Sequence, residues 1–255
     1  MTELELYEEI VRLNLRGEPY ALATVVAHSG SSPRKAGAKM LVRSDGSSLG
    51  SIGGGQVEKE TIEAALNALS VGESWTLEFV LTEENGFACG GCMSIFVEPQ
   101  GKRPLLVMFG AGHIGRAVSA LSHGCGFRVV VVDERTDCAV LELLPGADEV
   151  HCCPVATAFE RVRLDRESFV VIATPGHLHD FEAVRGCLAT DTGFIGLLGS
   201  RRKREVLLQT LTDEGYDIAQ RERINTPVGL DIGAETPEEI AVSIVAQLIK
   251  LKRRS

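Results

Sequence analysis

In the second half of the chain, short and nearly continuous apolar runs alternate with amphipathic segments. The strongest runs are LLVMFG, FRVVVVD, FVVIATP and GFIGLLG, and ADEVHCC is a weaker one. Helical periodicity follows the first run to about His123, the FVVIATP run through Arg185, and the last run from about Arg201. Apolar strands separated by amphipathic helices are typical of a parallel sheet that is covered on both faces. The pattern therefore predicts a doubly wound, Rossmann-like domain.

The amino-terminal part has a different pattern. An amphipathic helix ends near Gly17 and Pro19, and a second helix follows a glycine-rich stretch and ends near Ser70. Strand-like apolar character is found at residues 20–28, 39–43, 75–81 and 93–98. This mixture of strands with two helices fits a small α+β domain.

Proline and glycine between Glu98 and Pro104 interrupt both periodicities, which indicates a linker. We therefore expect an α/β protein of two domains. Residues 1–101 would form the small α+β domain, and residues 102–255 the Rossmann-like domain with a doubly wound parallel sheet. A last helix is marked by Thr236-Pro-Glu-Glu239, which has the pattern of a capping box with proline at the first helical position.

Composition narrows the class of partner. The 255-residue chain has a net charge of −9 and a pI near 5.3, so we expect neither non-specific nucleic-acid binding nor attachment to anionic membranes. No apolar run approaches the ~18 residues of a membrane span. The first residues lack the basic and apolar regions of a secretion signal. Seven cysteines without such a signal indicate free thiols in the cytoplasm.

A dinucleotide fingerprint follows the first apolar run of the second half. Gly110 permits a tight turn, Gly112 lets a pyrophosphate approach the backbone, and Gly115 lets helix and strand pack closely. Asp133 ends the next strand, where it can bind a ribose hydroxyl. Arg135 either neutralises a 2′-phosphate or is a solvated loop arginine. His113 lies inside the fingerprint, next to Ile114, and its side chain either meets the ligand or faces solvent.

Ligands of doubly wound sheets bind outside the carboxyl ends of the strands, where three loops of this chain should converge. They are the fingerprint, residues 173–180 and residues 198–204. The second loop carries Gly176 and, after it, His177, His179 and Asp180. These last three side chains suit ligand positioning, an acid/base pair or a metal, although no further cluster has metal-ligand spacing.

The third of these loops is basic. After Ser200, four cations open a helix, namely Arg201, Arg202, Lys203 and Arg204. Cations in a first turn oppose the helix macrodipole by some tenths of a kcal/mol each. The run therefore either holds an anion or forms a solvated basic face.

Two loops of the first domain suit a second ligand site. Residues 29–35 join small side chains to two cations and include Ser32 and Arg34, which suits an anion. The stretch GSIGGGQVEKE would let backbone approach a flat or phosphorylated ligand closely, and a plain pair of turns is the alternative. Cys89 and Cys92 form a CxxC pair, either redox-active or buried and structural.

These motifs, in their order along the chain, resemble the XdhC/CoxI family of xanthine dehydrogenase accessory factors. The matching segments are GSSPRKAGAKMLV, GSIGGGxVE, CGG before a strand ending in Glu-Pro, FGAGHIGRAV, VVVVDER, the Thr-x-Gly-His-x-His-Asp loop, GLLGSRRKR and PVGLDIGAETPEEIAVSIVAQ. The resemblance spans nearly the whole chain and agrees with the expected order of domains.

The resemblance implies a factor that binds a molybdopterin-type molybdenum cofactor, as such or as a dinucleotide. It also implies help with the sulfuration of this cofactor and its insertion into a molybdenum hydroxylase such as xanthine dehydrogenase. The expected partners are the apo-enzyme and a cysteine desulfurase, and the expected assembly is a homodimer. The cofactor phosphate would meet residues 110–115 and 201–203, and the pterin or dithiolene end would meet residues 31–35 and the glycine stretch. The expected cofactor-binding residues are Gly110, Gly112, His113, Ile114, Gly115, Asp133, Arg135, Gly176, His177, Ser200, Arg201, Arg202, Gly53, Gly54, Gly55, Gln56, Glu58, Ser32 and Arg34.

Two positions depart from the pattern of the resembled family. Gln56 stands where many members have cysteine, so no thiol is available there for sulfur or metal, and Pro175 stands where many have arginine. Two rival functions remain. One is an NAD(P)-dependent oxidoreductase with His113 or His177 as proton donor, and the other is a scaffold that joins desulfurase to target enzyme without binding cofactor.

Overall fold

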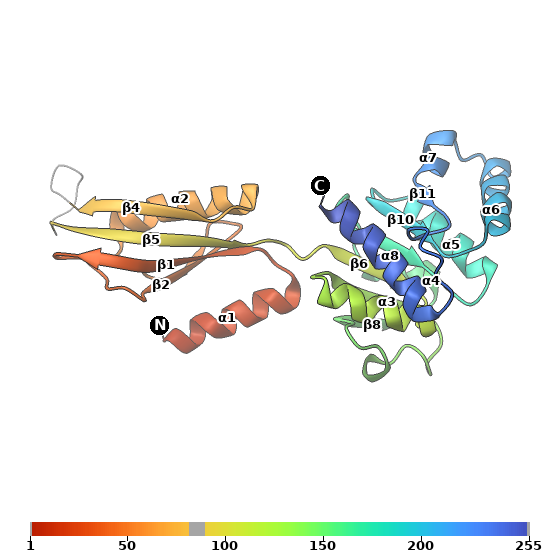
Figure 1. The fold of residues 1–255 in the computed structure, drawn as a ribbon, viewed down its shortest axis with the longest axis horizontal. Coiled ribbons are helices and arrows are strands. Elements are labelled where there is room, and N and C mark those ends of the chain that lie inside the picture. Colours follow the sequence, from red (N-terminus) through yellow and green to blue (C-terminus); the bar gives the residue numbers. More distant parts are fainter. Residues whose placement is uncertain (1, 82–89, 254–255) are drawn as a thin grey trace. The chain divides into compact units, whose positions relative to one another are not determined.

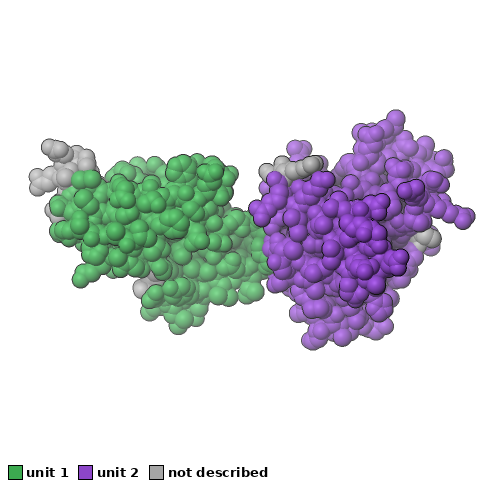
Figure 2. Space-filling model, viewed as in Figure 1, with its two compact units in different colours: residues 1–103 green, residues 104–255 purple. Residues whose placement is uncertain are grey.

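The computed structural model describes residues 2–81 and 90–253, and it divides the chain into two compact units, residues 1–103 and 104–255 (Figure 2). Each unit has its own sheet and its own hydrophobic core. The expected fold class, a small α+β domain followed by a Rossmann-like domain, is confirmed. Cys89 of the CxxC pair lies outside the described residues.

The first unit is an antiparallel sheet with one helix on each face (Figure 1). Its five strands have the order β3-β2-β1-β5-β4. Side chains alternate between the faces of a strand, so Met40 and Val42 pack under α2 while Leu41, between them, packs with Leu6 and Leu13 of α1. The elements are α1 (Glu3–Arg16), β1 (Tyr20–Ser29), β2 (Lys39–Arg43), β3 (Ser48–Gly50), α2 (Gly55–Val71), β4 (Trp75–Leu81) and β5 (Gly91–Gln100).

The sequence placed most of these elements within a few residues. Helix α1 has a capping box at Thr2 and ends at Gly17, which adopts the left-handed conformation typical of a helix C-terminus. Strand β3 was not predicted, because three residues of small or mixed character carry no readable period. Strand β5 extends to Gln100, so the linker is shorter than predicted.

The second unit is a six-stranded parallel sheet of order β11-β10-β9-β6-β7-β8. Helices α4, α5 and α6 cover one face, and α3 and α8 cover the other. The elements are β6 (Leu105–Phe109), α3 (His113–Gly124), β7 (Arg128–Asp133), the 3-10 turn η2 (Leu141–Leu143), β8 (Glu149–Cys152), α4 (Val155–Arg161), β9 (Phe169–Ile172), α5 (His177–Leu188), β10 (Phe194–Leu197), α6 (Arg201–Asp213), α7 (Ile218–Glu222), β11 (Ile224–Asn225) and α8 (Pro237–Lys252).

Helix α8 begins as predicted. Thr236 accepts a hydrogen bond from the backbone of Glu239, the Glu239 carboxylate accepts one from Thr236 N, and Pro237 occupies the first turn. The short elements α4, α7 and β11 were not predicted, because helices of seven and five residues do not establish a helical period and a strand of two residues forms no apolar run. None of the described helices is long and apolar enough to cross a membrane.

Candidate functional site

The strand order of the second unit places a switch point between β6 and β9. From β6 the chain winds outward through β7 and β8, and then returns to β9, β10 and β11 on the other side. In such sheets ligands bind in the crevice outside the carboxyl ends of the strands, at the point where the winding reverses. The fingerprint follows β6, and the loops at residues 173–176 and 198–200 follow β9 and β10. The three loops expected to converge therefore leave neighbouring strands at the same edge.

The three glycines of the fingerprint have different surroundings. A Cβ atom on Gly110, whose φ is +111°, would lie 2.3 Å from the carbonyl oxygen of Ala173, and one on Gly115 would lie 1.9 Å from the carbonyl oxygen of Gly110. A Cβ atom on Gly112 would meet nothing within 4 Å. Contacts within the protein therefore explain Gly110 and Gly115, and only Gly112 leaves open space at the loop.

Gly112 is also the N-cap of α3, and it provides no side-chain cap. No acidic residue stands in the first turn of α3. Among the described residues, the backbone N–H groups of residues 112–115 have no acceptor outside the helix. His113 is exposed, and Ile114 packs against the core. Unpaired amides at a helix N-terminus, together with the helix dipole, attract anions.

Asp133 does not offer its carboxylate to a ligand. Its Oδ2 accepts hydrogen bonds from Ala111 N at 2.7 Å and Arg135 Nη2 at 2.7 Å, and its Oδ1 accepts from Arg135 N at 3.0 Å and Nε at 2.9 Å. A carboxylate has about four acceptor positions, so a ribose hydroxyl would have to displace Arg135. Burial alone would raise the pKa of Asp133, but the hydrogen bonds from Arg135 and Ala111 outweigh burial and lower it.

The loops after β9 and β10 are joined by a buried ion pair. The Asp180 carboxylate, which is fully buried, accepts hydrogen bonds from Thr174 N and Oγ1 at 3.1 and 2.7 Å and pairs with Lys203 Nζ. Lys203 Nζ also donates to the carbonyl of Leu198 at 2.9 Å. Asp180 and Lys203 thus hold the two loops in place. His179 Nε2 lies 3.3 Å from Glu134 Oε1. Gly176 has a φ of +131°, a conformation that favours glycine.

The side chains of the basic run at the start of α6 lie in different surroundings. Ser200 caps the helix by accepting a hydrogen bond from Lys203 N at 3.3 Å. Arg202 lines one cavity with Phe181 and Val206, whereas Arg201 lines another one formed by the loop after β11. The structure therefore separates the two arginines that the sequence had grouped.

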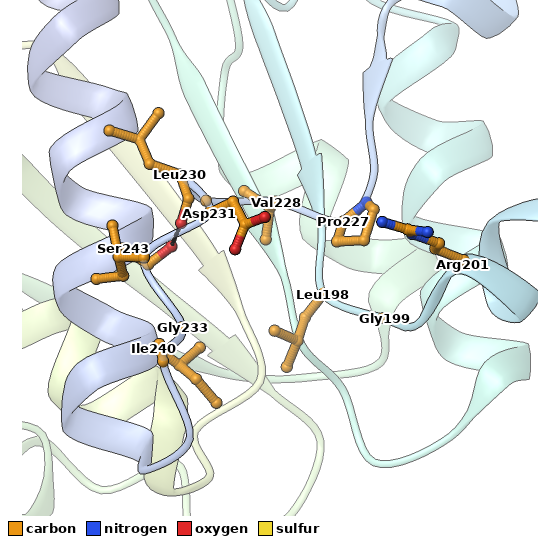
Figure 3. Close-up of a pocket in the computed structure, with 13 residues that line it drawn as sticks. Leu198, Gly199, Arg201, Pro227, Val228, Leu230, Asp231, Gly233, Ile240 and Ser243 are labelled. Atoms are coloured by element: carbon orange, nitrogen blue, oxygen red, sulfur yellow. Dashed lines mark hydrogen bonds between the residues drawn. The ribbon is translucent and has the colours of Figure 1, made fainter.

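The Arg201 cavity has a volume of about 490 Å³ (Figure 3). Its lining residues come from the loop after β10, the loop after β11 and the start of α8, and they are Leu198, Gly199, Arg201, Pro227, Val228, Gly229, Leu230, Asp231, Ile232, Gly233, Ala234, Ile240 and Ser243. Asp231 was not among the residues expected from the sequence. The only signal near it was the predicted capped start of α8, and the strand before it, β11, has only two residues and was not predicted.

In the first unit, the two loops named from the sequence touch each other. A Cβ atom on Gly53 would lie 2.7 Å from Cγ of Pro33. Ser32 Oγ donates to the carbonyl of Arg34 at 2.9 Å, and Arg34 lines a cavity of about 260 Å³ with Lys39. The side chain of Ser32 thus stabilises the turn to which it belongs. Arg34 places a cation beside the cavity.

The glycine stretch is hydrogen-bonded to a carboxylate of the protein itself, that of Glu58. Gly53, Gly54 and Gly55 have φ values of +145°, +79° and +59°, which residues with side chains rarely adopt. The Glu58 carboxylate accepts hydrogen bonds from Ser51 Oγ at 2.7 Å and Ile52 N at 3.1 Å. Burial would raise the pKa of Glu58, but bonds from Ser51 and from the backbone at Gly54, Ile52 and Gly53 lower it.

Gln56 stands beside this loop but does not take part in it. The side chain is exposed, and its Nε2 donates to Glu60 Oε1 at 2.7 Å along the helix. Among the described residues, no group of three or more His, Cys, Asp and Glu side chains is placed to hold a metal ion.

The fold and the site define a two-unit protein whose Rossmann-like domain leaves free amides and an open cavity at its ligand-binding edge. The family described as "XdhC Rossmann domain" matches residues 106–248, and the family described as "XdhC and CoxI family" matches residues 14–80. The chain belongs to the XdhC family.

Three curated relatives are similar to this chain. "Uncharacterized protein YqeB" of Escherichia coli (strain K12) is 36% identical over 99% of this chain and 47% of the relative. A probable xanthine dehydrogenase subunit of Bacillus subtilis (strain 168) is 33% identical over 63% of this chain and 47% of the relative. "Molybdenum cofactor insertion chaperone PaoD" of Escherichia coli (strain K12) is 22% identical over 93% of this chain and 85% of the relative. The chain thus spans about half the length of the first two relatives.

A solved structure has a similar fold along its whole length. It is described as a xanthine dehydrogenase from Bacillus halodurans, has 25% sequence identity and a TM-score of 0.55, and the match covers 100% of this chain and 96% of the other.

Proposed function

We propose that this protein binds a molybdenum cofactor of the molybdopterin type and assists its maturation and insertion into a molybdenum hydroxylase such as xanthine dehydrogenase. Membership of the XdhC family and similarity to a protein named as a molybdenum cofactor insertion chaperone support this proposal. The proposed partners are the apo-hydroxylase and a cysteine desulfurase that sulfurates the cofactor. We also propose a homodimer that works in the cytoplasm.

The observation that carries the proposal is the open space at Gly112. It lies beside N–H groups that lack acceptors among the described residues, at the switch point of the sheet. Molybdopterin ends in a phosphate, and a phosphate fits this combination because it needs several donors and close approach to the backbone. The residues present therefore fit this part of the cofactor.

The other groups at this edge differ in what they offer. Arg201 and Arg202 carry exposed cationic side chains that suit the anionic parts of the cofactor, whereas Lys203 is paired with Asp180. In the first unit, Arg34 lines a cavity of its own with Lys39 and is a separate proposed contact for an anion. When bound, the cofactor supplies a molybdenum centre held by the dithiolene of a pterin, and the chain's own groups bind and shield it. Gln56 provides no thiol, so the sulfur would come from the desulfurase.

The oxidoreductase alternative is not favoured by the geometry. Dinucleotide recognition would use the Asp133 carboxylate for a ribose hydroxyl, and Arg135 occupies that carboxylate. We therefore retain NAD(P) only as a comparison ligand in the experiment below.

The experiment is a titration of the purified protein with molybdopterin released from a molybdenum enzyme, with retention measured by gel filtration and pterin fluorescence. We expect retention at micromolar concentrations by the wild-type protein. Gly112→Asp should abolish it, because the added carboxylate repels phosphate at the free amides. The same substitution should not harm the fold, since aspartate is a favoured N-cap and the Cβ position is open.

Gly101→Asp is the matched control, because it adds the same charge at another position where a Cβ atom meets nothing within 4 Å. Retention by this control and not by Gly112→Asp supports the proposal. A wild-type protein that retains no molybdopterin, or that binds NADPH more tightly than molybdopterin, would refute it.

A further inference from the structure

The cavity at the carboxyl ends of β10 and β11 has no structural role that the contacts within the protein account for. Its volume of about 490 Å³ falls in the range of small-molecule sites, which is roughly 300–1,000 Å³. It opens at the edge of the sheet that also carries the fingerprint, with β9 lying between β6 and β10. Two strand spacings amount to about 10 Å, so an elongated ligand can reach from Gly112 to this cavity.

Two side chains of opposite charge line the cavity without pairing. Among the described residues, neither the Arg201 guanidinium nor the Asp231 carboxylate has a hydrogen bond or an ion pair. Figure 3 shows them on different sides of the pocket, Arg201 next to Pro227 and Asp231 next to Leu230. An arginine only donates hydrogen bonds and an ionised carboxylate only accepts them. A complementary ligand therefore presents N–H groups on one side and oxygen atoms on the other.

The backbone that carries Asp231 is fixed from several sides. Ser243 Oγ donates to the carbonyl of Leu230 at 2.5 Å, and Leu230 N donates to the carbonyl of Ser243 at 3.1 Å. Gly229 N donates to Gln247 Oε1 at 2.6 Å. Asp231 is thus presented by a pre-ordered loop, which lowers the entropic cost of binding.

Apolar side chains also line the cavity. They are those of Leu198, Val228 and Ile240. A lining that combines apolar side chains with a few polar groups suits a heteroaromatic ring that carries hydrogen-bonding edges.

We propose that this pocket binds the 2-amino-4-oxopyrimidine ring of the cofactor's pterin. Asp231 accepts hydrogen bonds from the 2-amino group and from N3–H, and Arg201 donates to oxygen atoms of the ligand. This assignment rests on the proposed function and deepens it. It differs from the expectation that the glycine stretch of the first unit holds the pterin, because Glu58 already accepts the hydrogen bonds of that stretch.

The test compares neopterin with the corresponding 6-substituted lumazine, in which a carbonyl oxygen replaces the 2-amino group. Quenching of the ring fluorescence is measured with the full chain. We expect the wild-type protein to bind neopterin about tenfold or more tightly than the lumazine, because the lumazine loses a charge-assisted hydrogen bond and sets an oxygen against the carboxylate.

The Asp231→Asn variant makes the test independent of folding. The amide of asparagine donates one hydrogen bond and accepts another, which matches the lumazine edge and mismatches the pterin edge. We therefore expect the preference to reverse. Glu238→Gln is the control, because it removes a negative charge from an exposed position on α8 that does not line the cavity. Its preference should remain that of the wild-type protein.

Equal affinities for neopterin and lumazine in the wild-type protein, or an unchanged preference in Asp231→Asn, would overturn the proposal. Guanosine monophosphate presents the same ring edge as a pterin. If it binds and neopterin does not, the pocket holds a nucleotide base and the pterin assignment fails. Retention of released molybdopterin by Asp231→Asn with unchanged affinity would refute the pocket assignment and leave the proposed function standing.

Discussion

Glycine at three positions of one loop serves two different purposes in this protein. Gly110 and Gly115 are required by neighbouring carbonyl groups, at 2.3 and 1.9 Å from an added Cβ atom. Gly112 has no such neighbour within 4 Å. At the scale of single residues, the fold thus separates the glycines that packing explains from the one whose Cβ position is open.

This difference predicts that alanine destabilises the protein at Gly115 and has little effect on stability at Gly112. Gly115→Ala should lower the free energy of unfolding by about 1–3 kcal/mol or more, because overpacking forces the loop or helix to move. Gly112→Ala should change it by less than about 1 kcal/mol and still weaken molybdopterin retention. Urea unfolding of both variants measures the first effect. Equal losses of stability in the two variants would contradict the different roles given to these glycines.

The residue scale also shows where the sequence was insufficient. The fingerprint assigned a role to each of Gly110, Gly112 and Gly115, because each role depends on the absence of a side chain. It did not predict that Arg135 covers the Asp133 carboxylate, because side-chain pairing between residues two apart in a loop depends on rotamers that no spacing specifies. Asp231 was missed for a similar reason, since its loop becomes part of a pocket only when β10 and β11 pair.

Helix α6 shows how an element can carry cations in its first turn. Ser200 caps the helix, and Lys203 pairs with the buried Asp180, so one of the cations that oppose the dipole is compensated. Arg201 and Arg202 then project into different cavities. The sequence showed the unusual run of cations, and the structure shows that its members have different partners.

A carboxylate of helix α1 is hydrogen-bonded to the sheet of its unit, in addition to the apolar packing of the helix, and this predicts a dependence on pH. Glu9 accepts hydrogen bonds from Arg12 and, across to β2, from Arg43 at 2.9 Å. The hydrogen bond from Arg12 is the largest cause that lowers the pKa of Glu9 from 4.5 to about 2; burial opposes it, and the hydrogen bond from Arg43 adds to the lowering. Because the folded pKa is depressed, the stabilisation is present above pH 4.5 and is lost as the pH falls through about 2.

The measurement is the difference in melting temperature between the wild-type protein and Glu9→Gln, followed from neutral pH downward. The difference should favour the wild-type protein at neutral pH and shrink in that acidic window. Glu8→Gln removes a charge from an exposed position of the same helix and serves as control. A difference that does not vary with pH would contradict the role given to Glu9.

The whole molecule consists of two units with separate cores, which predicts that the second unit folds alone. All strands of its sheet and the residues of both of its core clusters lie within residues 104–255. This segment, expressed without the first unit, should unfold in a single cooperative transition and keep the preference for neopterin over lumazine. Far-ultraviolet circular dichroism and the fluorescence titration measure both properties. A segment that is unfolded by itself would show that the units depend on each other.

At this scale the sequence predicted most of the architecture. Long apolar runs indicated β6, β7, β9 and β10, because buried parallel strands need apolar residues on both faces. The order of the strands was only partly predictable. Antiparallel pairing of β1 with β5 joins residues far apart along the chain, and no local pattern records which distant strand becomes a neighbour.

The Glu58 carboxylate has a consequence for selectivity in a cell. It is a tethered competitor, held a few residues from the amides that it occupies. A group attached by a short linker acts at an effective concentration of about millimolar or more. An external anion can use these amides only by displacing the Glu58 carboxylate, which weakens its apparent affinity for the glycine loop of α2. The first turn of α3 carries no acidic residue, so an anion at Gly112 would face no tethered competitor of this kind, and the two glycine loops differ in what an anion must displace.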